Sequence, residues 1–179
     1  MGHLHPTPIP ARPQPGGRGF PYGVRVRPSA GLLLYRYGVD GAVEVLLGHL
    51  GGPFWARKDA GAWSIPKGEY GAGEDPVAAA RREFREELGH PAPDAELTAL
   101  GTVRQAGGKQ VTVWAAEGDL DPATAVSNTF ELEWPRGSGV LRSYPELDRV
   151  AWYRVDAARE KLVRAQTAFL DRLVDTIGG

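Results

Sequence analysis

The sequence predicts an α/β domain, in which helices pack against the faces of a sheet. Two observations indicate this class: strand-like runs of apolar residues recur along most of the chain, and two helical segments with apolar stripes lie among them. At 179 residues the chain is long enough for one domain with its own core and an extension. No internal repeat or second domain is evident, so we expect an extension over residues 1–28 and one domain over residues 29–179.

The N-terminal extension is rich in proline, glycine and arginine and has almost no apolar periodicity. Such a composition favours a flexible tail, with a partner-binding arm as the alternative. It contains no apolar run suited to a secretory signal, and no segment of the chain approaches the length of a membrane span. We therefore expect a cytoplasmic protein without a membrane partner.

Charge and residue content exclude several classes of function. The 21 basic and 22 acidic residues nearly balance, so the chain has no general attraction to nucleic acid or to a membrane surface. The chain has no cysteine, which excludes disulfides, thiolate catalysis and cysteine-based zinc sites. The four histidines have no zinc-ligand spacing, and no phosphate loop ending in Gly-Lys-Ser or Gly-Lys-Thr occurs. The assembly is expected to be a monomer or a homodimer.

The first elements of the domain are predicted to form a β-hairpin. Residues 29–35 and 43–49 are rich in the aliphatic residues typical of strands. Residues 38–41, which include two glycines, suit the turn between them.

The loop at residues 51–61 is long and aromatic for a connector between strands. Phe54 or Trp55 could stack on a nucleotide base, and Arg57 or Lys58 could contact a phosphate. The alternative is a loop that its own aromatic side chains anchor to the core. Trp55, Arg57 and Lys58 are therefore candidate substrate-binding residues.

One helix has clearly marked boundaries. Asp75 is a good N-cap residue, Pro76 suits the first helical position, and Gly89 followed by Pro91 ends the helix. The sequence therefore predicts a helix from about Pro76 to Leu88. Its apolar residues recur at three- and four-residue steps and form a stripe that should be buried: Val77, Ala80, Phe84 and Leu88.

Three glutamates, Glu83, Glu86 and Glu87, lie on a different face of this helix. Their charges repel at these spacings, and each like-charged pair destabilises a helix by roughly a few tenths of a kcal/mol. A hard divalent cation with oxygen ligands would turn this repulsion into a binding site. The alternative is a solvated face, eased by pairing of Arg82 with Glu86.

The spacing of the whole stretch favours the metal site. Gly68, Glu74 and the run Arg82-Glu83-Phe84-Arg85-Glu86-Glu87-Leu88-Gly89 stand at the spacings of the Nudix box, so residues 68–90 resemble the signature of the Nudix hydrolase family. Every charged and glycine position matches, and only His90 replaces the usual aliphatic residue, at a packing position. The resemblance implies a Nudix-type α/β/α sandwich with a mixed central sheet.

Nudix enzymes use Mg²⁺ or Mn²⁺ to hydrolyse a diphosphate bond that is linked to another group, most often a nucleoside. The resemblance implies that Glu83, Glu86 and Glu87 hold the metal ions. It also implies that Glu83 or Glu86 accepts the proton of the attacking water, and these alternatives stay open. In the same family the backbone carbonyl at the position of Gly68 often reaches the metal.

Two basic residues complete the set that the resemblance implies. Arg82 would pair with Glu74 or Glu86 and so orient the catalytic carboxylates. Lys67 lies in the run Trp63-Ser64-Ile65-Pro66-Lys67-Gly68, which resembles a Trp-x-x-Pro-Lys-Gly run of Nudix enzymes acting on dinucleoside polyphosphates and inositol diphosphates. Lys67 would then be a point charge for a phosphate. The alternative is an ordinary loop lysine.

Further strands are expected beyond the box, at residues 97–105, 110–116 and 129–134. In the last of these, alternation places Glu131 and Glu133 on one face. Many Nudix enzymes bring one more glutamate from outside the box to the metals, and the resemblance makes Glu131 the candidate, with Glu133 as its alternative. The other explanation for this pair is the solvent side of a sheet.

The C-terminal part is predicted to contain a strand at residues 150–155 and one final helix with Asp156 as its N-cap. The helix carries an apolar stripe that we expect to pack on the sheet: Leu162, Phe169, Leu170, Leu173, Val174 and Ile177.

The favoured function is metal-dependent hydrolysis of a diphosphate bond in a small-molecule nucleotide. The run at residues 63–68 favours dinucleoside polyphosphates as the expected substrates, with nucleoside triphosphates as the second choice. Residues 106–109 lack the proline and the tyrosine that mark ADP-sugar and dinucleoside polyphosphate hydrolases in this family. The alternative function is a non-catalytic Nudix-fold module that binds nucleotides or partners. Such modules often lose box carboxylates, whereas this chain has all of them.

Overall fold

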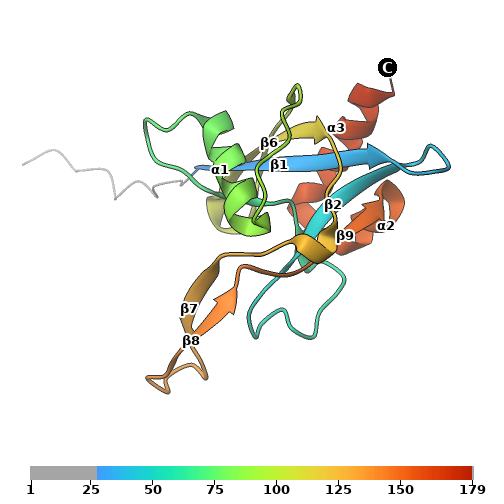
Figure 1. The fold of residues 1–179 in the computed structure, drawn as a ribbon. Helices are drawn as coiled ribbons and strands as arrows, with labels where there is room; N and C mark the ends of the chain where they lie inside the picture. The colour runs from blue at the N-terminus through green and yellow to red at the C-terminus, as the bar shows by residue number, and fades with distance from the viewer. Residues whose placement is uncertain (1–27, 179) are drawn as a thin grey trace, which may run out of the picture.

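A mixed seven-stranded sheet forms the centre of the computed structural model, which describes residues 28–178 (Figure 1). Its strands are β1 (Pro28–Tyr37), β2 (Val43–Leu50), β3 (Trp63–Ser64), β4 (Lys67–Glu69), β5 (Thr98–Arg104), β6 (Gln110–Glu117) and β9 (Leu147–Arg154). The order is β3, β2, β1, β6 and β5, while β4 also pairs with β1 and β9 with β2. β1 and β6 run parallel, and the other pairs run antiparallel. The predicted tail lies outside the described residues, apart from Pro28.

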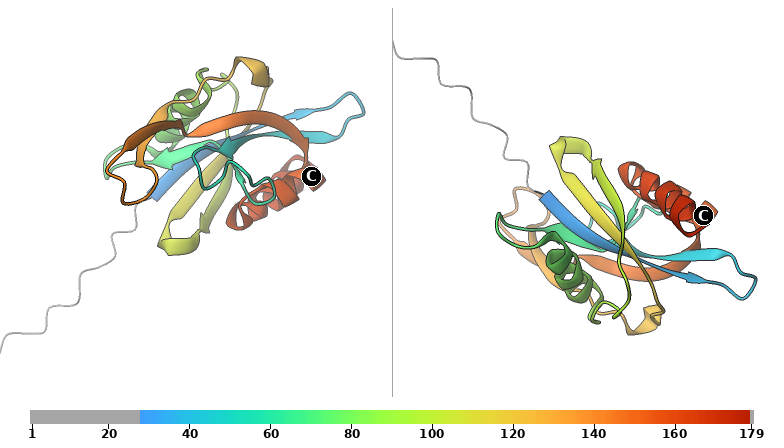
Figure 2. Two further views of the ribbon diagram at one scale, coloured as in Figure 1. Left: turned by 90° about the horizontal axis from the view of Figure 1, so that it is seen from below. Right: turned by 90° about the horizontal axis from the view of Figure 1, so that it is seen from above.

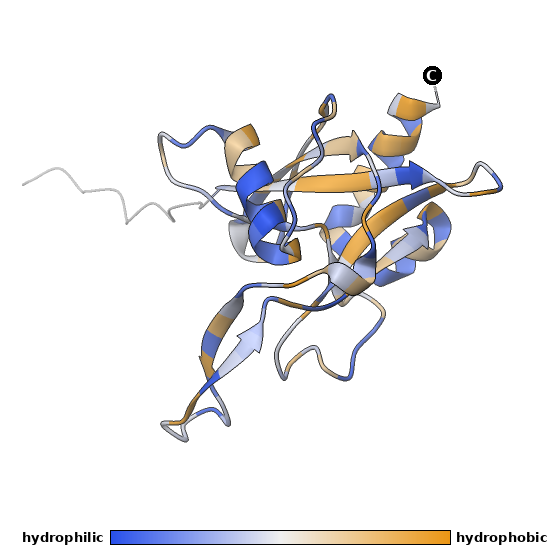
Figure 3. Ribbon diagram, viewed as in Figure 1, coloured by the Kyte–Doolittle hydropathy of each residue, from blue (hydrophilic) through white to orange (hydrophobic). Residues whose placement is uncertain are grey.

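Helices cover both faces of this sheet, as Figure 2 shows. They are α1 (Pro76–Leu88), α2 (Val155–Lys161) and α3 (Thr167–Ile177). Consecutive side chains of β1 point to opposite faces, so Leu32 and Leu34 pack with α1, whereas Leu33 packs with α2 and α3. The apolar residues of β1 and β2 and the polar residues along α1 are visible in Figure 3. The predicted α/β/α sandwich with a mixed sheet is confirmed.

The predicted hairpin is present as β1 and β2, which pair antiparallel with Tyr35 opposite Val45. Its turn is closed by a hydrogen bond of 2.8 Å from the Gly38 N–H to the Ala42 carbonyl. Gly41 adopts a φ of 77°, a conformation that residues with a side chain rarely adopt.

Helix α1 begins and ends where its capping residues predict. The Asp75 carboxylate accepts a hydrogen bond of 2.9 Å from the Ala78 N–H, and Pro76 is the first helical residue. At the other end Gly89 has a φ of 74° and donates its N–H to the Arg85 carbonyl at 2.8 Å. Local sequence therefore places the whole box helix.

The prediction of one continuous C-terminal helix is wrong. Helix α2 ends at Lys161, Leu162 is extended, and a short 3-10 turn precedes α3. The reason is a tertiary contact, because the Val163 N–H donates to the Trp63 carbonyl at 2.8 Å and Leu162 is bridged to Trp63 alongside β3. Asp156 lies inside the first turn of α2 and is not its N-cap.

A second, two-stranded sheet extends from the central one (Figure 1). It consists of β7 (Thr129–Glu133), which the sequence predicts, and β8 (Leu141–Pro145), which it does not. Glu131 and Glu133 therefore lie in a hairpin of their own. Within residues 28–178, no helix is both long and apolar enough to cross a membrane.

Candidate active site

An acidic cavity of about 350 Å³ lies between α1, β4 and the segments on either side of the second sheet. Its lining residues come from six separate parts of the chain: Ser29, Lys67, Gly68, Glu69, Glu83, Glu86, Lys109, Asn128 and Glu146. The structure thus brings together four predicted site residues, namely Lys67, Gly68, Glu83 and Glu86. It also brings in Glu146, which the sequence analysis missed.

Glu83 and Gly68 are in unusually close contact. Glu83 is buried on the inner side of α1, with 7% of its surface exposed. A Cβ atom added to Gly68 would lie only 1.9 Å from Glu83 Oε2 and 2.1 Å from Glu83 Cδ. The box therefore needs glycine at this position so that the backbone of β4 can approach the carboxylate.

Glu87 is the most deeply buried carboxylate of the box, at 4% exposure. Its Oε2 accepts a hydrogen bond of 3.0 Å from the backbone N–H of Lys67. Burial raises the pKa of Glu87 to about 8, the charge of Lys67 opposes this rise, and the charges of Glu146 and Glu83 add to it. Burial also raises the pKa of Glu83, against the opposing effect of Arg82.

The guanidinium of Arg82 holds the carboxylates of the box in one arrangement. Its Nε donates to Glu74 at 2.8 Å, and its Nη1 donates to Glu83 at 2.5 Å and lies 3.3 Å from Glu86. A fourth contact runs from Arg82 Nη2 to the Glu69 carbonyl at 3.3 Å. The hydrogen bond to Glu74 is the main cause that raises the pKa of Arg82 above its usual value. Burial acts in the opposite direction but is weaker, so the side chain stays charged.

Glu146 is fixed by its own backbone between the two sheets. Its N–H donates to the Asn128 carbonyl at 2.9 Å, and its carbonyl accepts from the Gly51 N–H at 2.9 Å. Glu146 lines the acidic cavity together with Glu83 and Glu86, and its charge contributes to the raised pKa values of Glu83 and Glu87. Glu146 is therefore a further carboxylate of this site.

The structure does not bring Glu131 or Glu133 to the acidic cavity. Glu131 is exposed in β7, opposite Ser143, and Glu133 accepts a hydrogen bond of 2.6 Å from the Gly139 N–H. The strand β9 begins at Leu147, three residues before the predicted start at residue 150, and Glu146 directly precedes it. The pairing of β9 with β2 carries Glu146 to the cavity.

Replacing Glu146 with glutamine should lower kcat/KM about 10- to 100-fold, the usual effect of residues that support a metal site. The reason is the loss of one negative charge beside Glu83 and Glu87. The matched control is Glu131→Gln, which should change kcat/KM less than about twofold because Glu131 is exposed away from the cavity. Steady-state hydrolysis with Mg²⁺ or Mn²⁺ measures both. The opposite ranking of the two variants would restore Glu131 as the additional ligand.

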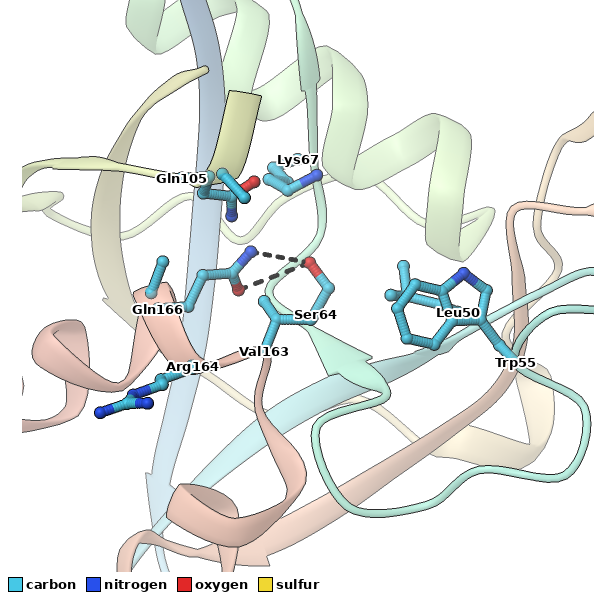
Figure 4. Close-up of a pocket in the computed structure, with 10 residues that line it drawn as sticks. Leu50, Trp55, Ser64, Lys67, Gln105, Val163, Arg164 and Gln166 are labelled. Carbon is cyan, nitrogen blue, oxygen red and sulfur yellow. Dashed lines mark hydrogen bonds between the residues drawn. The ribbon is translucent and has the colours of Figure 1, made fainter. Parts of the chain in front are cut away.

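A second and wider cavity, of about 600 Å³, is shown in Figure 4. The surface of this cavity is mainly apolar, although half of its ten lining residues are polar or charged: Leu50, Trp55, Ser64, Lys67, Gln105, Ala106, Val163, Arg164, Ala165 and Gln166. Its size is typical of small-molecule sites. Lys67 lines both cavities and so marks their junction.

The aromatic loop at residues 51–61 forms one wall of the wide cavity and is also anchored. Trp55 lines the cavity, packs against the core and lies 5.0 Å from the Lys58 ammonium, measured to the ring centroid. The alternative of a loop anchored by its own aromatic side chain therefore applies to Trp55, and contact of its ring with a substrate stays a prediction. Arg57 is exposed and lines neither cavity.

A buried histidine holds this loop in place. His49 Nε2 lies 2.7 Å from the Lys58 carbonyl, which can only accept, and His49 Nδ1 lies 2.6 Å from Asp148 Oδ1. The side chain of His49 is fully buried. The position of Trp55 thus depends on a contact made from β2.

Replacing His49 with leucine should raise KM several-fold and leave kcat within about twofold, because the loop that carries Trp55 loses its tether. It should also cost about 1–3 kcal/mol of stability, since two buried hydrogen bonds are lost. His90→Leu is the control, because His90 hydrogen-bonds Thr124 in an exposed segment and lines neither the acidic nor the wide cavity. Steady-state kinetics and thermal unfolding measure both effects. An unchanged KM would show that the loop keeps its place without His49.

The donor set of the acidic cavity suits a hard divalent cation. Carboxylate oxygens are the ligands that Mg²⁺ and Mn²⁺ prefer. Glu83, Glu86 and Glu146 line one cavity, and their mutual repulsion is of the kind that a cation relieves. In the described part of the chain, no three acidic or histidine side chains already form a closed metal-binding cluster. Arg82 occupies oxygens of Glu83 and Glu86 instead.

Comparison with known proteins agrees with this arrangement. A family model described as NUDIX domain matches residues 26–173. No curated protein is significantly similar to the chain in sequence.

Solved structures share the fold. One is an Ap4A hydrolase from C. elegans, with 22% identity, a TM-score of 0.58 and coverage of 85% of this chain and 98% of that one. A Nudix hydrolase from M. smegmatis, RenU, has 26% identity, a TM-score of 0.56 and coverage of 86% of each chain. The NUDIX domain of NrtR from Shewanella oneidensis, complexed with ADP ribose, has 16% identity, a TM-score of 0.59 and coverage of 84% and 88%. The chain therefore belongs to the NUDIX family, and the enzyme class predicted from its sequence, a pyrophosphohydrolase, is confirmed.

Proposed function

We propose that this protein hydrolyses a diphosphate bond in a nucleoside diphosphate-linked small molecule, with Mg²⁺ or Mn²⁺. The observation that carries the proposal is the position of Lys67 at the junction of an acidic cavity and a mainly apolar one. A nucleotide matches both, because its base is aromatic and its phosphates need cations. The Lys67 ammonium would meet the phosphate chain where it passes from one cavity to the other.

The proposed metal ligands are Glu83, Glu86 and Glu87 of the box, the Gly68 carbonyl, and Glu146 in place of Glu131. A bound cation would neutralise charge on the diphosphate and acidify a water molecule. Arg82 keeps the carboxylates in position by pairing with them.

Glu86 is the better candidate for the group that accepts the proton of the attacking water. Its side chain is 40% exposed and lies 3.3 Å from Arg82. Glu83, by contrast, is buried and held by Arg82 at 2.5 Å. That contact occupies Glu83 Oε1, so this oxygen is less available to take a proton from a water molecule.

Dinucleoside polyphosphates are the proposed preferred substrates, with nucleoside triphosphates second. The run at residues 63–68 supports this order of substrates. Ser64 lines the wide cavity, Lys67 lines both cavities, and Trp63 lies in the hydrophobic core. A cytoplasmic location and a monomeric or homodimeric state belong to the same proposal.

The test is a chromatographic assay of wild type and Glu86→Gln against diadenosine polyphosphates, nucleoside triphosphates, ADP-ribose and 5′-triphosphorylated RNA, with Mg²⁺ or Mn²⁺. We expect cleavage of a diadenosine polyphosphate that is fastest in the panel and falls at least about 100-fold in Glu86→Gln. Metal binding measured by calorimetry without cleavage of any compound would instead favour a nucleotide-binding module.

A further inference from the structure

Within residues 28–178, Gln105 has a buried side-chain nitrogen, Nε2, that makes no hydrogen bond. Buried polar groups are nearly always paired, and leaving one unpaired costs about 1–3 kcal/mol. Gln105 lines the wide cavity, beside Lys67 (Figure 4). The unpaired donor therefore points to a ligand that would pair with it.

The backbone around Gln105 is held by a tight loop and does not depend on the cavity. The Gln105 N–H donates to the Lys109 carbonyl at 2.7 Å, and its carbonyl accepts from the Gly108 N–H at 3.2 Å. Between them, Gly107 and Gly108 have φ values of 79° and 81°, which favour glycine. The backbone that carries the Gln105 side chain is thus fixed between β5 and β6.

The other polar side chains deep in the cavity already satisfy one another. Gln166 Oε1 accepts from the Ile65 N–H at 2.8 Å, and Gln166 Nε2 donates to Ser64 Oγ at 3.0 Å. The Ser64 hydroxyl in turn donates to the Ile65 carbonyl at 2.9 Å. These bonds fix the wall that faces Gln105, and the contact between Gln166 and Ser64 is drawn in Figure 4.

Apart from the charged side chains of Lys67 and Arg164, the rest of the lining is apolar or aromatic. It consists of Leu50, Trp55, Ala106, Val163 and Ala165. Such walls favour a flat ring over a charged or strongly hydrated group. A purely aliphatic ligand would leave the Gln105 amide unpaired, whereas a heteroaromatic ring with an acceptor atom would pair it.

We propose that the wide cavity binds the heteroaromatic base of a nucleotide and that Gln105 is the residue that reads its edge. The Gln105 amide donates from Nε2 to a ring nitrogen or an exocyclic oxygen of the base, and Trp55 contributes an aromatic surface. This inference rests on the proposed function, because Lys67 then joins the bound base to the phosphates at the acidic cavity. It assigns substrate recognition to the loop after β5, outside the box.

The experiment tests whether the effect of replacing Gln105 depends on the presence of the base in the substrate. Wild type and Gln105→Leu are assayed with ATP and with ribose 5-triphosphate, which lacks the base. We expect kcat/KM for ATP to fall about 10- to 100-fold in Gln105→Leu, and kcat/KM for ribose 5-triphosphate to stay within twofold. Gln110→Leu is the matched control, since Gln110 lines neither cavity, and it should leave both values unchanged.

Equal changes on both compounds in Gln105→Leu, or no change on either, would overturn the inference. Calorimetry with AMP and with ribose 5-phosphate, in the absence of metal, measures binding of the base independently of hydrolysis. It therefore distinguishes failure of this inference from failure of the proposed function. AMP binding that weakens at least about tenfold in Gln105→Leu supports the inference even if no compound is hydrolysed. If ATP is hydrolysed but Gln105→Leu changes neither ATP hydrolysis nor AMP binding, the proposed function stands and this inference is wrong.

Discussion

Replacing Glu87 with glutamine is expected to lower turnover about 10²- to 10⁴-fold and, at the same time, to stabilise the metal-free protein at neutral pH. The loss of turnover follows from removing the charge of a proposed metal ligand, which lies against the backbone of Lys67 and does not itself line the acidic cavity. The gain in stability follows from burial: Glu87 is 4% exposed and its pKa is raised to about 8. Glutamine can still accept the Lys67 N–H bond without a buried charge.

The pH dependence has a definite sign. In the unfolded chain this carboxyl has its ordinary pKa of 4.5, so between pH 4.5 and about 8 the folded protein binds a proton that the unfolded chain has lost. The contribution to stability is complete below pH 4.5 and is lost as pH rises to about 8. Each unit of pKa difference corresponds to about 1.4 kcal/mol.

Thermal unfolding of wild type and Glu87→Gln with EDTA, from pH 5 to pH 9, measures this effect. We expect the difference in Tm to favour the variant and to grow with pH up to about 8. A difference that does not change with pH would show that Glu87 carries no raised pKa in the folded protein. Unchanged turnover with Mg²⁺ or Mn²⁺ would contradict its role at the site.

Gly68→Ala should lower kcat at least about 100-fold while the protein still folds. The added Cβ would lie 1.9 Å from Glu83 Oε2, so the carboxylate must leave its present position beside Arg82. Misplacing a catalytic group by about 1 Å costs on the order of 10²-fold in rate. The backbone of Gly68 itself needs no positive φ, so the change acts on Glu83 and not on the conformation of β4.

Gly71→Ala is the matched control, because nothing lies within 4 Å of a Cβ at that position. Steady-state kinetics and circular dichroism of the two variants test the prediction. A fully active Gly68→Ala protein would mean that Glu83 can move without loss of catalysis, and the close contact would then have no catalytic importance.

The sequence by itself determined the box helix, the hairpin and the fold class. The helix boundaries of α1 depend on Asp75, Pro76 and Gly89, whose contacts are with residues close in the sequence. Capping signals alone therefore predict where α1 begins and ends. Alternation in β1 likewise decides which leucines face which helix. The spacing of Gly68 and the three box glutamates also led to the family, since that signature lies within one short stretch.

Tertiary structure decided the parts that depend on distant segments. Glu146 reaches the acidic cavity because β9 pairs with β2, and no local pattern around Glu146 reveals that pairing. The predicted final helix is broken at Leu162 because the backbone there joins Trp63, and this break buries Gln166 against Ser64. The orphaned donor of Gln105 likewise exists only where three remote segments enclose a cavity. Helix capping and hydrophobic periodicity depend on residues that are close in the sequence. Strand pairing and the burial of side chains depend on residues far apart in the chain.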